Sequence, residues 1–302
     1  MALDVAAFQK RLDENSEYKG VPFGRVHLIF EAEEEHAQAC LKYNGYLHLS
    51  DAFKCHFLEA VELLNTEVRP KVKSPLSEFY PLFMARLAHS FRTLCGAERV
   101  SLRGYPYHGY ALLRNTFDNL LMTSAALQKV TDFYALEGIE PGKEIDPVQI
   151  KKRRKLAEWH TTAVMTGAKS GLSEKTISEV AIWDAMFDYE THGARLSVAS
   201  AMGWMKGTEP LPVVPKFSES AFAIFVNRYC EIGWMTHRLV PLIQSPDAAL
   251  PDSWKKKWRV IDESFEIMVN SLTEQSGKAI GAAIVELVKA KFPFNESGAF
   301  PL

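Results

Sequence analysis

Two charged side chains stand four residues apart in an otherwise apolar stretch of the chain. Arg114 and Asp118 are flanked by leucines and a phenylalanine in YALLRNTFDNLL. Four-residue spacing puts both side chains on one face of a helix, where they can pair. The planar guanidinium of Arg114 suits a phosphate or a carboxylate, so the pair predicts a catalytic or anion-binding site. The alternative is a buried salt bridge that links this helix to its neighbours.

Histidines are the next candidates, because imidazole changes its charge near neutral pH. His192 follows Asp188 and Glu190 and precedes Gly193, a setting that suits a general base or a phosphate contact. A capping or core hydrogen-bonding role is the alternative for the same residue. Either role places His192 at a helix junction.

A second histidine forms a pattern with an arginine. Arg154 and His160 have five residues between them in KKRRKLAEWH. On a helix this places a cation and an imidazole one to two turns apart, where they can activate a ribose 2'-hydroxyl and hold the phosphate. The basic run 151–155 suits contact with RNA or another polyanion, and its alternative is a solvated helix face.

Metal and cofactor motifs are scarce. A ferritin-like di-iron bundle needs two Glu-x-x-His pairs, and the chain offers one, Glu33 with His36. His36 and Cys40 are spaced as two zinc ligands on a helix, but no CxxC or HExxH accompanies them. Phosphate-cradling GxxxxGK[ST] and hydrolase GxSxG patterns are missing as well. We predict no metal and no cofactor.

The elements that must position these residues are helices. Apolar residues recur at three- and four-residue steps, which predicts an amphipathic helix over 105–129. Further helices are expected over 31–66, 78–95 with Gly96 as its end, 147–168, 174–187, 220–242, 254–272 and 278–290. Ser50 is expected either to cap a helix or to lie inside one. No stretch has the alternation of a sheet, so the fold class is all-α, a multi-helix bundle with largely antiparallel neighbours.

Glycine and proline divide the chain. We expect an N-terminal arm over 1–30, a helical core over 31–136, a linker over 137–150 and a second helical part over 151–302. The second part is expected to pack on the first as one domain. In it, Trp254 and Trp258 alternate with lysines, a pattern that suits a partner or polyanion surface.

Composition limits the class of protein. The chain has 302 residues, 47% of them hydrophobic and 24% charged, with a formal net charge of -2. These values predict a globular protein with a substantial core and no generally nucleic-acid-coating surface. Four scattered cysteines, an acidic start and no long apolar run predict reduced thiols, a cytoplasmic location and no membrane span. The partners considered are RNA, another protein and a second copy of the chain.

One stretch resembles a known family. The run ARLAHSFRTLCGAERVSLRGYPYHGYALLRNTFDNLL, residues 85–121, is similar to the core of a bacterial all-helical family in which a Gly-Tyr turn precedes A..LLR..FE, with Asp118 here in place of Glu. In that family a Tyr-x-x-Ser/Thr-x-x-x-His segment follows, and Tyr189, Thr191 and His192 are a more compact counterpart. The family resembles, distantly, the HEPN nucleases, helical RNases of defence systems.

Two hypotheses therefore follow from the sequence. The first is a helical, defence- or stress-associated protein with HEPN-like, metal-independent RNase activity, in which His160 or His192 supplies the imidazole. The second is a non-enzymatic helical scaffold or partner-binding protein, in which Arg114 and Asp118 are purely structural.

Overall fold

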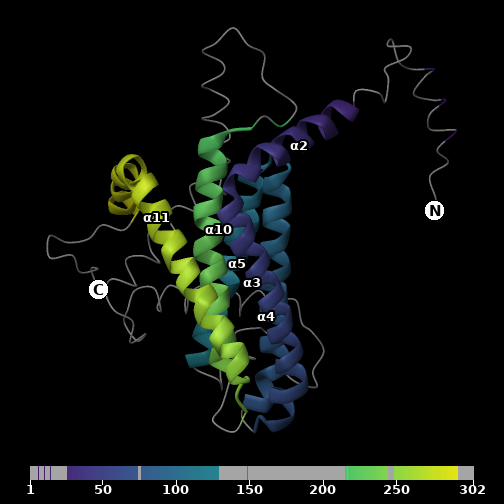
Figure 1. The fold of residues 1–302 in the computed structure, drawn as a ribbon, viewed down its shortest axis with the longest axis vertical. Helices are drawn as coiled ribbons and strands as arrows, with labels where there is room; N and C mark the ends of the chain where they lie inside the picture. The colour runs from purple at the N-terminus through teal and green to yellow at the C-terminus, as the bar shows by residue number, and fades with distance from the viewer. Residues whose placement is uncertain are drawn as a thin grey trace.

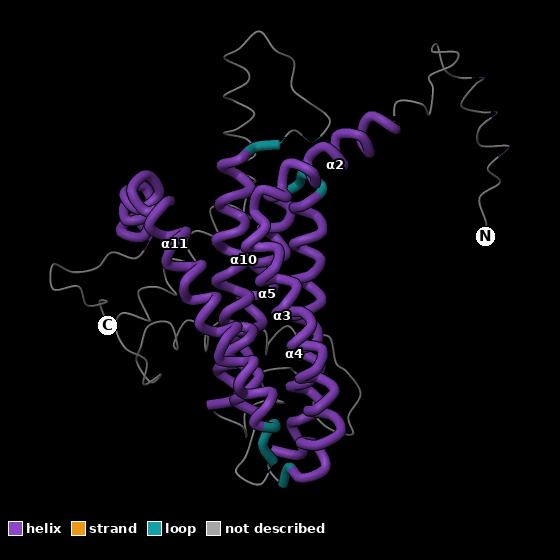
Figure 2. Tube along the Cα trace, viewed as in Figure 1, coloured by secondary structure: helices purple, strands orange, loops and turns teal. Residues whose placement is uncertain are grey.

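The computed structural model is a bundle of long helices (Figure 1). It describes residues 26–73, 76–128, 217–243 and 248–291, with residues 6, 10, 14, 148 and 215 in addition. The α-helices are α2 (Val26–Cys40), α3 (Asn44–Leu63), α4 (Leu76–Leu102), α5 (Pro106–Gln128), α10 (Glu219–Leu239) and α11 (Asp252–Lys291). Shorter helical turns are Leu41–Tyr43, Leu64–Val68, Arg69–Lys71 and Val240–Ile243. No β-strand occurs in these ranges, and the predicted all-α class is confirmed (Figure 2).

Most neighbouring helices run antiparallel, as predicted. The pairs α3 with α4, α4 with α5, α10 with α11 and α11 with α3 all have this arrangement. Two contacts along each pair show it, in the same order: Phe57–Phe91 and Tyr46–Glu98, Gly96–Leu112 and Arg86–Asn119, His237–Trp258 and Trp234–Asp262, and Glu59–Lys257 and Gly45–Met268. Helix α10 is the exception, because it runs parallel to α3, as successive contacts from Tyr46 to Phe222 and from Phe53 to His237 require.

The core lies between α3, α4, α5, α10 and α11 and is rich in aromatic side chains. On α3 the buried residues recur at helical spacing, which is why this helix forms and which face it turns inward. The largest fully buried side chains are Trp254, Tyr80, Tyr229, Phe53, Phe57, Phe83, Phe117, Phe222, Phe225 and Phe265. Burial of each such side chain contributes on the order of 2 kcal/mol.

The turn between α4 and α5 corrects one prediction. Gly96 does not end α4, which continues to Leu102. The stop comes at Gly104, which has a φ of +97°, and the N–H groups of Gly104 and Tyr105 donate to the carbonyls of Ser101 and Val100. This is a Schellman motif, and it needs a glycine at the position with positive φ. Pro106 then begins α5, as prolines often do at a first helical position.

Helix α11 corrects another prediction. Two helices were expected over 254–272 and 278–290, yet a single helix of 40 residues runs from Asp252 to Lys291. In a helix interior Gly277 costs only about 1 kcal/mol relative to alanine, and Ser276 costs less, which is too little to require a break. The helix rises along the outside of the bundle beside α10 (Figure 1). The expected helices over 147–168 and 174–187 lie outside the described residues.

Gly109 makes a testable contribution to the packing of α4 on α5. A Cβ at this position would overlap the hydroxyl oxygen of Ser101 and lie 2.9 Å from the carbonyl oxygen of Ala97. We expect Gly109→Ala to lower the free energy of unfolding by about 2 kcal/mol, because the backbone of α4 cannot yield. Urea denaturation followed by circular dichroism measures this change.

Gly96→Ala is the matched control for this substitution. Its added Cβ would lie 3.7 Å from the Leu112 side chain, an ordinary contact. Replacing a mid-helix glycine by alanine without a clash should stabilise the protein by about 1 kcal/mol. Equal effects of the two substitutions would contradict the close approach of the helices.

Candidate functional site

The Arg114–Asp118 pair exists and lies near the surface of α5. The Arg114 Nε donates to the Asp118 Oδ2 at 3.0 Å, and the side chains are 21% and 46% exposed. The pairing predicted from the spacing is therefore present, but the pair is not enclosed in the core. Arg154, His160 and His192, the other predicted site residues, lie outside the described residues.

Polar side chains beside this pair join α4 to α5. The Arg86 guanidinium donates to the Asn119 side-chain oxygen at 2.9 Å, and the Asn119 amide donates to the Arg86 carbonyl at 3.0 Å and to the Ser90 hydroxyl. Burial lowers the pKa of Arg86 to about 10. The guanidinium still carries its charge at neutral pH and serves as a helix-to-helix link.

A buried carboxylate lies at the centre of the bundle, and sequence reasoning missed it. Glu98 on α4 is 3% exposed. Its Oε1 accepts hydrogen bonds from Tyr46 at 3.1 Å and from Ser50 at 2.6 Å, and its Oε2 lies 2.5 Å from the Lys54 ammonium. The Ser50 proton is used on Glu98, so the Tyr229 hydroxyl donates to Ser50 at 2.8 Å. We call these five residues the Glu98 network.

The surroundings fix the protonation states of the lysine and the two tyrosines of the Glu98 network. Burial by itself lowers the pKa of Lys54, but the hydrogen bonds and charges of Glu98 and, to a smaller extent, of Asp51 outweigh it, and the net shift is upward. Burial raises the pKa of Tyr46 and of Tyr229 well above the ordinary value. The lysine therefore stays protonated and the tyrosines stay neutral. The contacts of the network hold α3, α4 and α10 together.

A second polar feature fastens α11 to the bundle. His56 on α3 stacks on Trp254 with ring centres 4.4 Å apart, and His237 on α10 stacks on Trp258 at 5.0 Å. Each histidine Nε2 lies 3.2 or 3.0 Å from the backbone carbonyl of its tryptophan, and each tryptophan Nε1 donates to the carbonyl of its histidine. We call these two pairs the His–Trp clasps.

The His–Trp clasps overturn the prediction of a tryptophan surface. Trp254 is 1% exposed, and Trp258 packs against the core. Trp254 is therefore not available to a partner or a polyanion, and Trp258 is partly buried against His237. Because carbonyls only accept hydrogen bonds, each histidine carries its proton on Nε2. In the described part of the chain, the buried Nδ1 of His56 has no hydrogen-bond partner.

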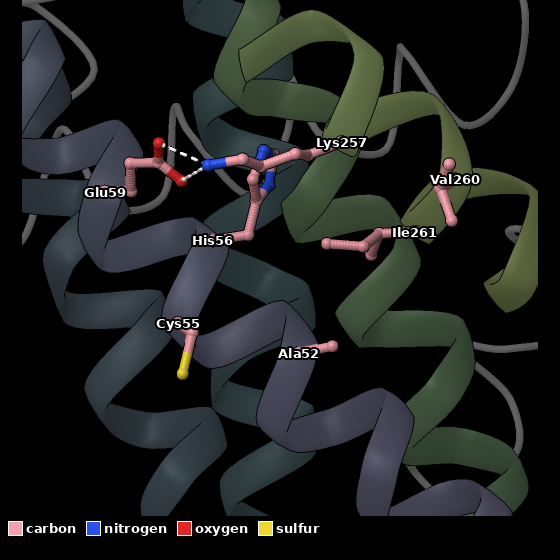
Figure 3. Close-up of a pocket in the computed structure, with 7 residues that line it drawn as sticks. All are labelled: Ala52, Cys55, His56, Glu59, Lys257, Val260 and Ile261. Carbon is pink, nitrogen blue, oxygen red and sulfur yellow. Dashed lines mark hydrogen bonds and ion pairs between the residues drawn. The ribbon is translucent and has the colours of Figure 1, made fainter. Parts of the chain in front are cut away.

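A groove lies beside the first clasp, between α3 and α11 (Figure 3). Its volume is about 410 Å³, and its lining residues are Ala52, Cys55, His56, Glu59, Lys257, Val260 and Ile261. The Lys257 ammonium and the Glu59 carboxylate pair at 2.7 Å across it, next to the His56 ring (Figure 3). The groove is open to solvent and mostly apolar, so it suits an apolar side chain or a small molecule.

The residues considered as metal ligands have other partners. Glu33 accepts a hydrogen bond from the Tyr105 hydroxyl at 3.0 Å, and the His36 Nδ1 lies 3.1 Å from the Leu102 carbonyl and 3.4 Å from the Cys40 sulfur. Burial raises the pKa of Cys40 to about 12, so its thiol is protonated at neutral pH. Among the described residues, no group of three or more His, Cys, Asp or Glu is placed to hold a metal ion.

Comparisons with family models, curated proteins and solved structures find no match to the chain. The resemblance to the bacterial helical family and to HEPN nucleases therefore stays a prediction. Among the described helices, none is long and apolar enough to cross a membrane. The site has to be interpreted from its own geometry.

The Glu98 network yields a stability prediction. Glu98→Gln keeps the shape of the side chain but removes the negative charge beside Lys54 and can turn an amide donor toward the ammonium. We expect a loss of about 3 kcal/mol in the free energy of unfolding, because a buried ion pair is broken. Among the described residues, Lys54 then keeps only Asp51, 3.0 Å away with a side chain that is 75% exposed, as a counter-charge. Urea denaturation at neutral pH measures the loss.

Glu59→Gln is the control for Glu98→Gln. It breaks the ion pair between Glu59 and Lys257, whose side chains are 39% and 57% exposed. Such an exposed pair contributes less than about 1 kcal/mol. Equal losses for the two substitutions would show that the burial of Glu98 has no energetic importance.

The His–Trp clasps yield a prediction about pH. Burial, with a smaller effect of the neighbouring His56, lowers the pKa of His237 to about 4, although the Trp258 carbonyl and Asp262 act to raise it. The unfolded chain, with an ordinary histidine pKa near 6.5, binds this proton first. Stability from His237 is therefore complete above about pH 6.5 and is lost as the pH falls toward 4, by about 3 kcal/mol at most.

A glutamine at position 237 separates this effect from the titration of carboxylates. His237→Gln retains a donor for the Trp258 carbonyl and does not titrate. We expect the decrease in unfolding free energy between pH 7 and pH 4 to be smaller in the variant than in the wild type, by urea denaturation with tryptophan fluorescence. His89→Gln, which removes an exposed histidine, is the control. Identical pH profiles for wild type and His237→Gln would show that His237 is not a neutral, buried group.

Proposed function

We propose that this protein is a helical scaffold that binds a partner through the groove between α3 and α11. The observation that carries the proposal is the groove itself, an open and largely apolar recess of about 410 Å³ in the surface of the bundle. Val260, which lines the groove, is 64% exposed, and Ile267, seven residues further along the same face of α11, is 70% exposed. Clustered exposed apolar groups on a soluble surface mark interaction sites.

The walls of the groove support the proposal because they are held rigidly. The clasps of His56 with Trp254 and of His237 with Trp258 tie α11 to both α3 and α10. The Glu98 network ties α3 to α4 and α10. A binding surface that is already in place loses little conformational entropy when the partner binds.

Two polar clusters of the described helices have structural partners. The Glu98 network is neutral or paired throughout, and the Arg114–Asp118 pair is an intrahelical link on α5. In this proposal Arg114 and Asp118 are structural. The HEPN-like RNase hypothesis rests instead on Arg154, His160 and His192, which lie outside the described residues, and it stays a prediction.

A photo-crosslinking amino acid placed in the groove tests the proposal. It replaces Ala52, which lines the groove, and in a control variant it replaces the exposed Arg99 on α4. After irradiation of living cells, we expect defined products of higher mass from position 52 and not from position 99. The same products from both positions, or none from position 52, would contradict a docking role for the groove.

Cleavage of labelled single-stranded RNA tests the competing hypothesis in the same preparation. We expect the wild type, His160→Ala and His192→Ala to show the same background rate. Cleavage by the wild type that disappears in either alanine variant would establish the RNase reading instead and displace the scaffold proposal.

A further inference from the structure

Helix α11 presents an outward face that the bundle does not cover. Val260 and Ile267 are 64% and 70% exposed and stand seven residues apart, so they lie on one face of the helix. Between and beside them on the same face are the exposed Lys256, Glu263 and Asn270. Val260 also lines the groove, so the exposed stripe and the groove form one continuous surface.

The exposed charges of α11 are segregated between residues 256 and 266. Lys256, Lys257 and Arg259 come first, and Glu263 and Glu266 follow. Before them, Asp252 pairs with Lys255 at 3.3 Å, and Lys257 pairs with Glu59 of α3 at 2.7 Å. A second copy of the same helix, laid antiparallel, brings the basic half of each copy against the acidic half of the other. A parallel arrangement would instead place like charges together, which is unfavourable.

One register of the two antiparallel helices brings both the apolar residues and the opposite charges into contact. When Val260 of one copy faces Ile267 of the other, a two-fold axis passes near residues 263 and 264. The same register brings the exposed Arg259 next to Glu266 of the second copy, at the edge of the apolar contact. A self-complementary patch of this kind is what a two-fold dimer requires.

We propose that the groove and the outer face of α11 bind a second copy of this chain, by antiparallel pairing of the two α11 helices. Ile267 of the second copy packs against Val260 at the rim of the groove, and reciprocal contacts between Arg259 and Glu266 set the register. This proposal rests on the scaffold function and names its partner. The exposed apolar rim of the groove is then covered by the second copy.

Charge reversal tests the pairing. Sedimentation velocity of the full chain over about a hundredfold range of concentration should show a monomer–dimer equilibrium for the wild type. Arg259→Glu and Glu266→Arg should each weaken dimerisation about tenfold, and the double variant should return to within about twofold of the wild type, because the contact is restored with opposite polarity. Arg99→Glu, on α4, should have no effect.

Substitution of an apolar residue on the outer face of α11 provides a second test of the dimer. Ile267→Glu should shift the protein to monomer with an unchanged circular dichroism spectrum, since Ile267 is 70% exposed and contributes little to the core. Any of three results would overturn the pairing. The wild type could be monomeric at every concentration, the dimer could persist in Ile267→Glu, or the double charge variant could dimerise as weakly as the single variants. A monomer that still gives defined crosslinks from position 52 would refute only the second copy as partner, whereas histidine-dependent RNA cleavage would refute the scaffold function itself.

Discussion

The bundle depends on the buried carboxylate of Glu98 and on the Lys54 ammonium that pairs with it. Glu98 lies among aromatic rings, where an unpaired charge would cost several kcal/mol. Lys54 balances the charge, and Ser50 and Tyr46 supply hydrogen bonds that fix its position. Because the partners lie on α3 and, through Tyr229, on α10, the network links three helices in the observed register. Aromatic packing supplies most of the stabilising free energy, while this polar network selects which packing is adopted.

A small number of polar contacts also holds α11 on the bundle. Its first turns carry two tryptophans whose stacked histidine partners sit on different helices, so the outer helix is fixed by α3 and α10 together. Arg238 adds a two-pronged contact to Asp262, with both distances 2.9 Å, and the Trp234 indole donates to the same carboxylate at 2.7 Å. Burial alone would raise the pKa of Asp262, but these donors hold it below its usual range. The helix is thereby locked on its inner face and exposed on its outer face.

Sequence periodicity predicted the helical fold well, and the reasons for its failures are local. The helix over 105–129 matches α5 closely because Pro106 and the apolar spacing both act within the helix. Gly96 was mistaken for a stop because a glycine can end a helix, whereas the choice between Gly96 and Gly104 is made by the Schellman hydrogen bonds and by the packing of Ala97 and Glu98 on the core. Helix ends depend on such tertiary contacts, and residue types alone do not reveal them.

The candidate site was less predictable because polar residues give no direct sign of their burial. Glu98 continues the stripe of Leu87, Phe91 and Leu94 at three- and four-residue steps, and a carboxylate in an apolar stripe is the signal that identifies it. His56 and His237 lack such a signal, since their roles depend on tryptophans about 200 and 20 residues away.

For Trp254 and Trp258, the residue types alone likewise did not show which side chains are buried. Their lysine neighbours suggested a polyanion surface, but lysines and tryptophans occupy different faces of α11. The face that remains exposed carries Val260 and Ile267 together with polar side chains such as Glu263. What the helix offers to a partner is therefore decided by which of its faces the bundle has already used.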